Sequence, residues 1–426
     1  MHIKMIKNKT LHDFEDVIRS CVKCGVCQAH CPAYQANKNE GSVARGKIAL
    51  AAALIDGETV MEERLKEDIS MCLMCGSCVS KCPNKVPTHE IVGAIRREVS
   101  EEDGQTFVGK SIATLLGSKS LMKTLIKSGA AFSPLLLKKV PETSGLRLRL
   151  PTPIMKGRTF PKVPFKNLFD RVPEFVEGYD SKPVVGFFAG CSISYIYPET
   201  GEWMVSILKD MGYSVFTPRA QQCCGIPALS SGNGKLIEEL SANNIEAFNG
   251  RELVYIITAC GSCNSGIGEY YSSMDGMDES FTGKVIDFSV FLKENGLFDR
   301  LAEMEKQQDA VTVAYHDPCH LKLQGITKEP RELLNLLPNV NYVEAQGASY
   351  CCGLGGTFSV YHYETSKEIG NRKMEGLEDS GAELIATGCP GCIMQLQDSI
   401  NHAEMNVKAV HILELLAKAL KLKEMK

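Results

Sequence analysis

Residues 21–32 read CVKCGVCQAHCP, and residues 72–83 repeat the pattern as CLMCGSCVSKCP. Each cysteine of the second run lies 51 residues after its counterpart, so both runs have the spacing C-x2-C-x2-C-x3-C-P. This spacing is the bacterial ferredoxin signature, because three thiolates close in sequence can bind one [4Fe–4S] cube while the fourth ligates the other cube. The sequence therefore predicts two [4Fe–4S] clusters near the N-terminus.

The crossed ligand rule assigns four cysteines to each of these clusters. Cluster 1 takes Cys21, Cys24, Cys27 and Cys82, and cluster 2 takes Cys72, Cys75, Cys78 and Cys31. Between the runs, apolar residues recur at helical spacing from Val43 to Leu54, and Gly57 can end that helix. A second helix is expected over residues 60–69. We therefore expect residues 1–105 to form an α-helical ferredoxin domain.

The remaining ten cysteines form a second and longer repeat. Five are Cys191, Cys223, Cys224, Cys260 and Cys263, and their counterparts are Cys319, Cys351, Cys352, Cys389 and Cys392. The offset is 128 residues for the first three and 129 for the last two, so each half reads C-x31-CCG followed by C-x2-C. Because all eighteen cysteines fall into repeats, metal binding explains them better than scattered buried thiols or disulfides.

Short β-rich runs precede four of these cysteines and alternate with amphipathic stretches, as expected for parallel βα units. The runs are Val184–Ala189, Leu253–Ala259, Val311–Tyr315 and Leu384–Thr387, and the amphipathic stretches include Glu202–Met211 and Gly234–Phe248. The cysteines then lie at the carboxyl ends of strands, where open α/β sheets build their sites. Gly225 and Gly353 follow the paired cysteines, and glycine lets backbone N–H groups approach a bound cluster. We predict two duplicated α/β, Rossmann-like halves over residues 181–300 and 301–426.

The doubled five-cysteine pattern resembles the CCG domains of heterodisulfide reductases. It also resembles the iron–sulfur subunits of glycolate oxidase, D-lactate dehydrogenase, lactate-utilisation proteins and anaerobic glycerol-3-phosphate dehydrogenase. The stretch CCGLGGTF at 351–358 is most similar to the lactate and glycolate branch, and SVARGK at 42–47 is similar to a glycolate-oxidase segment. CGIP at 224–227 is shared more widely. The resemblance covers Asp16 to about Ile400 and implies a helical ferredoxin domain fused to two CCG domains.

The resemblance also implies a function. In the lactate and glycolate branch, a separate FAD-containing dehydrogenase subunit oxidises the hydroxy acid, and the iron–sulfur subunit passes electrons to a quinone or another acceptor. In heterodisulfide reductases, the CCG cysteines hold noncubane clusters that cleave a thiol disulfide. Both CCG motifs are complete here, so a disulfide-reducing catalytic subunit is the alternative, and one or two further clusters are expected. A structural zinc protein is a third alternative, but the three-residue cysteine rhythm ending in Cys-Pro argues against it.

The chain lacks a G-x-G-x-x-G dinucleotide loop and a P-loop, so we expect the flavin on a partner subunit. The glycines after Cys352 form a loose Gly-rich loop, which we interpret as part of a cluster site. His316 and His320 flank Cys319 and are candidates for proton delivery, because histidine titrates near neutrality. The alternative for either histidine is a structural hydrogen bond at a strand end. The sequence leaves open the physiological donor and acceptor, the reduction potentials and the oligomeric state.

The net charge of −4 gives no indication of nucleic-acid binding. We expect a cytoplasmic location, because no apolar run is long enough to span a bilayer and the first residues lack a signal peptide. Residues 106–180 are expected to form a basic, Pro-rich linker. Within it, residues 110–166 contain twelve basic residues and one acidic residue, and several leucines form an apolar helical face. We predict peripheral contact with a membrane or an acidic flavin subunit; the alternative is a solvated linker whose leucines pack on the ferredoxin domain.

Overall fold

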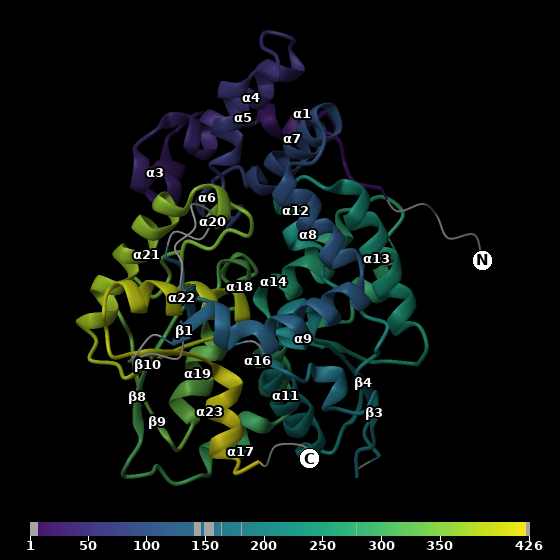
Figure 1. Ribbon diagram of the computed structural model, residues 1–426, viewed down its shortest axis with the longest axis vertical. Helices are drawn as coiled ribbons and strands as arrows, with labels where there is room; N and C mark the ends of the chain where they lie inside the picture. Colours follow the sequence, from purple (N-terminus) through teal and green to yellow (C-terminus); the bar gives the residue numbers. More distant parts are fainter. Residues whose placement is uncertain are drawn as a thin grey trace.

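The computed structural model describes residues 7–139, 146–148, 157–162, 164–179, 181–277 and 279–422. Within these ranges the chain forms a helical N-terminal part and two α/β parts, each built on a mainly parallel sheet. Figure 1 shows the helical part, in purple and blue, at one end of the molecule above both α/β parts. The mixed α/β architecture agrees with the prediction, while the finer Rossmann-like likeness and the domain boundaries stay predictions.

The N-terminal part is helical, as predicted. Its elements are η1 (His12–Phe14), α1 (Glu15–Arg19), α2 (Val26–His30), α3 (Pro32–Asn37), η2 (Glu40–Ser42), α4 (Ala44–Ile55), α5 (Glu63–Ser70), α6 (Ser77–Lys81) and α7 (Thr88–Asp103). Helix α4 is the predicted helix between the cysteine runs, and α5 begins three residues later than expected. Gly25 and Gly76 precede α2 and α6 at φ of 83° and 64°, a turn that glycine adopts without strain. The two cysteine runs therefore have matching local structure.

The first α/β part contains a five-stranded sheet with the order β3-β5-β4-β6-β7. Its strands are β3 (Phe175–Val176), β4 (Val184–Phe188), β5 (Ser214–Phe216), β6 (Ile256–Thr258) and β7 (Val285–Asp287). Only β3 pairs antiparallel. Its helical elements are η3 (Leu168–Asp170), α10 (Gly190–Tyr195), α11 (Pro198–Asp210), α12 (Ile226–Ser230), α13 (Gly234–Phe248), α14 (Gly261–Asn264), the π-helix η4 (Ser265–Tyr270), α15 (Glu279–Thr282), α16 (Phe288–Glu294) and α17 (Leu297–Ala302).

The second α/β part contains a four-stranded parallel sheet with the order β11-β10-β8-β9. Its strands are β8 (Val311–Tyr315), β9 (Val340–Val343), β10 (Leu384–Thr387) and β11 (Lys408–His411). Its helices are α18 (Cys319–Leu323), α19 (Lys328–Leu336), α20 (Phe358–Tyr361), α21 (Tyr363–Glu378), α22 (Pro390–His402) and α23 (Ile412–Ala419). The four apolar runs predicted before the cysteines all contain strands, so these cysteines follow the carboxyl ends of β4, β6, β8 and β10.

The two α/β parts meet at equivalent turns. Cys260 and Cys389 have nearly the same backbone conformation, with φ and ψ of −146° and 115° in one and −147° and 114° in the other. The Gly261 N–H donates to the carbonyl of Gly388 at 3.0 Å. This contact brings the carboxyl ends of β6 and β10 together, and with them both C-x2-C motifs.

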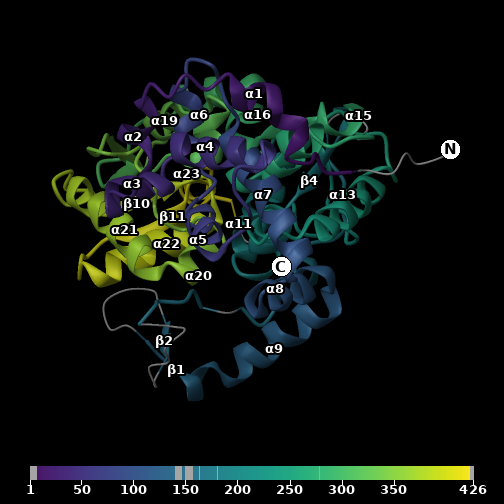
Figure 2. The ribbon, with the colours of Figure 1, turned by 90° about the horizontal axis from the view of Figure 1, so that it is seen from above.

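The basic segment begins as two helices, α8 (Phe107–Gly117) and α9 (Lys119–Leu136), and continues into the antiparallel pair β1 (Leu137–Lys139) and β2 (Leu146–Leu148). In Figure 2, α9 and the β1–β2 pair lie at the edge of the molecule. Helix α8 packs on α12 and α13 of the first α/β part. Packing of the leucines of residues 110–166 on the ferredoxin domain stays a prediction. Residues 140–145, 149–156 and 163 lie outside the described residues. No described helix is long and apolar enough to cross a bilayer.

Asp287 caps helix α16 inside the first α/β part, where its Oδ1 accepts from the backbone N–H of Ser289 at 2.9 Å. Its Oδ2 has no hydrogen-bond partner among the described residues. Burial raises the pKa of Asp287 to about 7. The unfolded chain loses this proton near pH 4 and the folded chain near pH 7, so the free energy of unfolding should fall as pH rises through this window.

We predict that Asp287→Asn flattens this pH dependence. In the wild type, the free energy of unfolding should fall by at most about 1.4 kcal/mol per pH unit, which is the limit for the release of one proton. Anaerobic calorimetry from pH 5.5 to 7.5 measures the effect as a fall in Tm that is larger for the wild type than for the variant. Equal slopes in both proteins would contradict the protonated state of Asp287.

Candidate metal centres

The eight ferredoxin-type cysteines line two neighbouring cavities. Cys21, Cys24, Cys27 and Cys82 border the first cavity. Cys31, Cys72 and Cys75 border the second, and Cys78 borders both. Cys31 and Cys82 have each joined the three cysteines of the other run, which supports the crossed ligand assignment.

Two basic side chains that the sequence analysis gave no role lie beside the second cavity. Lys47 is 1 % exposed and donates to the carbonyl of Gly41 at 2.7 Å. Burial lowers its pKa, while the nearby thiols of Cys72 and Cys31 act in the opposite direction. Arg96 donates to the carbonyls of Cys72 at 2.8 Å and of Ser230 at 3.1 Å. Arg96 thereby fixes the second cysteine run to the first α/β part.

The five cysteines of the first CCG motif converge. Cys223 Sγ lies 3.5 Å from Cys191 Sγ. The Cys224 thiol interacts with those of Cys223 and Cys263, and Cys263 interacts in turn with Cys260. Hydrogen bonds from Cys223 and Cys263 lower the pKa of Cys224 well below its usual value. The thiolate form, which binds metals, is therefore favoured at the second cysteine of this pair.

The second CCG motif repeats this arrangement. Cys351 interacts with Cys319 and Cys352, and Cys392 interacts with Cys352 and Cys389. Hydrogen bonds from Cys351 and Cys392 lower the pKa of Cys352 well below its usual value. Cys352 thus matches Cys224 of the first motif.

The sulfur groups also contact one another across the domains. Cys260 Sγ and Cys389 Sγ lie 3.9 Å apart and join the two CCG sites. The thiols of Cys75 and Cys319 interact and join the second ferredoxin-type site to the second CCG site. A cavity of about 640 Å³ at this junction is lined by Cys75 and by nine of the ten CCG cysteines. The chain therefore places its cysteines in one continuous series.

The donor set fits iron–sulfur clusters, because soft thiolates are the ligands of such clusters. The backbone also approaches the sulfurs closely. A Cβ at Gly190 would lie 2.6 Å from Cys263 Sγ, so a larger residue is excluded there. Gly225 and Gly353 have φ of 91° and 97°, a conformation that glycine adopts without strain. Iron–sulfur clusters, when bound, would supply one-electron carriers at these sites.

The two predicted histidines have different positions. His320 lines the large cavity, and its Nδ1 lies 3.2 Å from Ser262 Oγ. His316 is fully buried beside Cys352 and Cys392 and does not line this cavity. Burial, and then the nearby Lys373 ammonium, lower the pKa of His316. Of the two, only His320 lies where it could exchange a proton with a molecule in the cavity.

Comparison with known proteins agrees with this organisation. The CCG cysteine-rich domain matches residues 185–268 and 313–397, and the 4Fe-4S dicluster domain matches residues 17–86. A probable glycolate oxidase iron-sulfur subunit of Bacillus subtilis (strain 168) is 27 % identical, over 98 % of this chain and 97 % of the relative.

Two further relatives match different shares of this chain. A fumarate reductase (CoM/CoB) subunit from Methanothermobacter marburgensis is 29 % identical, over 95 % of this chain and 73 % of the relative. Lactate utilization protein A 1 of Bacillus mycoides (strain KBAB4) is 31 % identical, over 54 % of this chain and 96 % of the relative.

We predict that Cys31→Ser damages cluster 2 and leaves cluster 1 intact, because Cys31 lies with the second cysteine run. Iron should fall by about four atoms per chain when one [4Fe–4S] cluster is lost. Anaerobic iron and sulfide analysis with EPR of the reduced protein measures this. Cys24→Ser is the control that identifies the cluster 1 signal, and loss of that same signal in Cys31→Ser would overturn the crossed assignment.

Proposed function

Because this chain belongs to the family of iron–sulfur proteins with CCG cysteine-rich domains, we propose that it is the electron-transfer subunit of a lactate- or glycolate-type dehydrogenase. It is an oxidoreductase subunit, and its cysteines are suited to hold iron–sulfur clusters. The observation that carries the proposal is the continuous series of cysteines from the helical part to the junction of the CCG sites. Such a series suits electron transfer between a donor and an acceptor that bind at different places.

In this proposal the protein determines where each cysteine group lies and how far it is exposed to solvent. Eight of the ten CCG cysteines are buried, whereas Cys24 of the first cavity is exposed. Two apolar side chains beside Cys24 are also exposed, Val22 by 69 % and Val26 by 43 %. We propose that a redox partner docks on this apolar surface around Cys24, because exposed apolar groups next to a redox centre favour a close approach.

The partner in this proposal is an FAD-containing dehydrogenase subunit, and the final acceptor is a quinone or another oxidant. Two features support a flavin held elsewhere. The glycine-rich loop after Cys352 packs against protein, since a Cβ at Gly355 would lie 3.0 Å from Leu73 and one at Gly356 would lie 2.7 Å from Ser230. The Bacillus subtilis relative is itself named as one subunit of an oxidase.

A second candidate function is reduction of a thiol disulfide. It is favoured by the cavity of about 640 Å³ at the junction of two complete CCG motifs, and by the relative that is named as part of a CoM/CoB fumarate reductase. Turnover of a thiol disulfide by the isolated chain, with a reduced dye as donor, would favour this function over pure electron transfer.

We predict that the tagged chain captures a flavoprotein from anaerobic lysate of its source, and that Val22→Glu with Val26→Glu weakens capture about tenfold. The added charges should disrupt an apolar interface without reaching the ligating sulfurs. Mass spectrometry and flavin fluorescence identify the captured protein, and iron analysis verifies that the clusters remain. Val60→Glu is the matched control, because Val60 is 73 % exposed but lies outside the first cavity. Capture of no flavoprotein would contradict the proposed partner.

The basic segment gives a separate proposal of peripheral membrane contact. Leu116 and Met122 line a small cavity together with Cys191, whereas Leu121 and Leu125 are 36 % and 48 % exposed. The two exposed leucines, together with the basic side chains of this segment, suit an anionic lipid surface.

We predict that the chain floats with anionic liposomes at low salt and is released at high salt, because salt screens the basic residues. Leu121→Glu with Leu125→Glu should abolish flotation. Val254→Glu, at a site that is 42 % exposed on the first α/β part, should leave it unchanged. Wild-type protein that stays at the bottom of the gradient would remove membrane contact from the proposal.

A further inference from the structure

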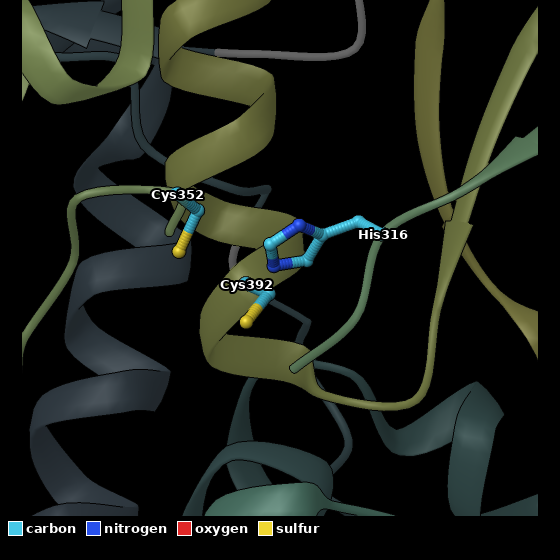
Figure 3. A group of neighbouring side chains, drawn as sticks. All are labelled: His316, Cys352 and Cys392. Carbon is cyan, nitrogen blue, oxygen red and sulfur yellow. The ribbon is translucent and has the colours of Figure 1, made fainter. Parts of the chain in front are cut away.

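The second CCG site contains a nitrogen donor among its sulfurs. A ring nitrogen of His316 and the Sγ atoms of Cys352 and Cys392 all lie within 4.8 Å of one another, and all three residues are buried. Figure 3 shows the imidazole turned toward the two sulfur atoms. In the part of the chain that the structure describes, this is the one group of three metal-ligating side chains that includes a histidine.

The imidazole of His316 interacts with the Cys352 thiol and with no other hydrogen-bonding group among the described residues. Neither ring nitrogen is paired with an oxygen or nitrogen atom of another described residue. His411, also fully buried in this half, differs: its Nε2 lies 2.9 Å from the carbonyl oxygen of Ala259, and its Nδ1 accepts from the N–H of Leu413 at 3.2 Å. Buried polar groups are normally well paired, so an imidazole whose described polar contact is a thiol, and which lies beside two sulfurs, indicates a partner that the polypeptide does not supply.

The duplication shows that the fold itself does not require this nitrogen. The residue at the equivalent position of the first half, 128 residues earlier, is Phe188. Phe188 is fully buried and stacks on Phe248 with ring centroids 5.9 Å apart. A Cβ at Gly190 would lie 3.3 Å from the Phe188 ring and 2.6 Å from Cys263 Sγ, so this ring lies near Cys263, the counterpart of Cys392. An aromatic ring is sufficient for packing at this position.

We propose that His316 is a metal ligand: a ring nitrogen binds an iron of the cluster held by the second CCG motif, next to Cys352 and Cys392. The second site then has mixed sulfur and nitrogen coordination, whereas the first has cysteine alone. In a tetrahedral site with metal–sulfur bonds near 2.3 Å and metal–nitrogen bonds near 2.0–2.1 Å, neighbouring ligand atoms are about 3.5–3.8 Å apart. The observed grouping is compatible with this after a small inward movement. The inference rests on the proposed iron–sulfur content of this motif.

This ligand would make the two CCG sites electronically different. A neutral imidazole adds no negative charge, and histidine ligation raises the potential of iron–sulfur centres that have it. A second difference acts in the same direction. Lys373, buried, donates to the carbonyls of Gly347 and Ala348 at 2.8 and 2.9 Å. Its charge interacts with Asp317, which is itself paired with Arg331 at 2.6 Å, and then with Cys352 and Cys392. Asn244 stands at the equivalent place on α13, 129 residues earlier. The second CCG site is thus the one that holds an electron more readily.

The test is pulsed EPR of the reduced full-length chain, prepared anaerobically with either 14N- or 15N-labelled histidine. The wild type should show a histidine nitrogen coupling that changes with the isotope. His316→Phe places the residue of the first half at this position, so the protein should fold and lose the coupling. If the cluster is lost in this variant, His316→Cys supplies a thiolate instead and should retain the iron without the coupling.

His411→Asn is the matched control, because it removes another buried histidine of the same half while retaining a side-chain cap, and it should keep the coupling. Coupling that persists in His316→Phe, or that is absent from a wild type carrying its full iron and sulfide, would overturn the ligation by His316. A wild type that contains no iron and sulfide, or contains zinc in their place, would instead overturn the cluster content on which the proposed function depends.

Discussion

A thiolate buried away from water needs a positive partner. In this structure many cysteines are buried close together, so many such partners are needed in one region. Eight of the CCG cysteines are buried and packed against one another, where uncompensated negative charge would be costly. Bound iron meets the requirement directly, because each thiolate gives its charge to the metal. Much of the remaining structure can be understood as the support that this cysteine series needs.

The buried basic side chains are one part of that support. Lys47 and Arg96 lie at the second ferredoxin-type site, and Lys373 lies at the second CCG site. Each donates to backbone carbonyls, so each cation also fixes the loop that carries the nearby cysteines. Burial lowers the pKa of Lys373 to about 8. Because burial disfavours a charged lysine, such a side chain is expected where nearby negative charge stabilises it.

The two CCG halves share the same backbone framework for their cysteines, but the residues around that framework differ between them. The turns at Cys260 and Cys389 keep the same backbone conformation, and the halves join through them at 3.9 Å between sulfurs. The surroundings have diverged: His316 and Lys373 stand where the first half has Phe188 and Asn244. Two sites with equal sulfur ligands can therefore have different affinities for an electron, which is a requirement for directed transfer.

The linear sequence was enough to predict the cysteine groups, the helices α4 and α13, the strands that precede the cysteines, and the family resemblance. These features depend on spacing and local periodicity, which can be detected along the chain. The short strands β5, β7, β9 and β11 were not predicted: unlike the equally short β6 and β10, they do not lie in an apolar run that leads directly into a cysteine motif. It took the folded chain to show that Cys75 meets Cys319, that Cys260 meets Cys389, and that His320 faces the cavity while His316 faces the sulfurs. These contacts join residues up to hundreds of positions apart, and their geometry is fixed by packing between domains, for which local sequence contains no signal.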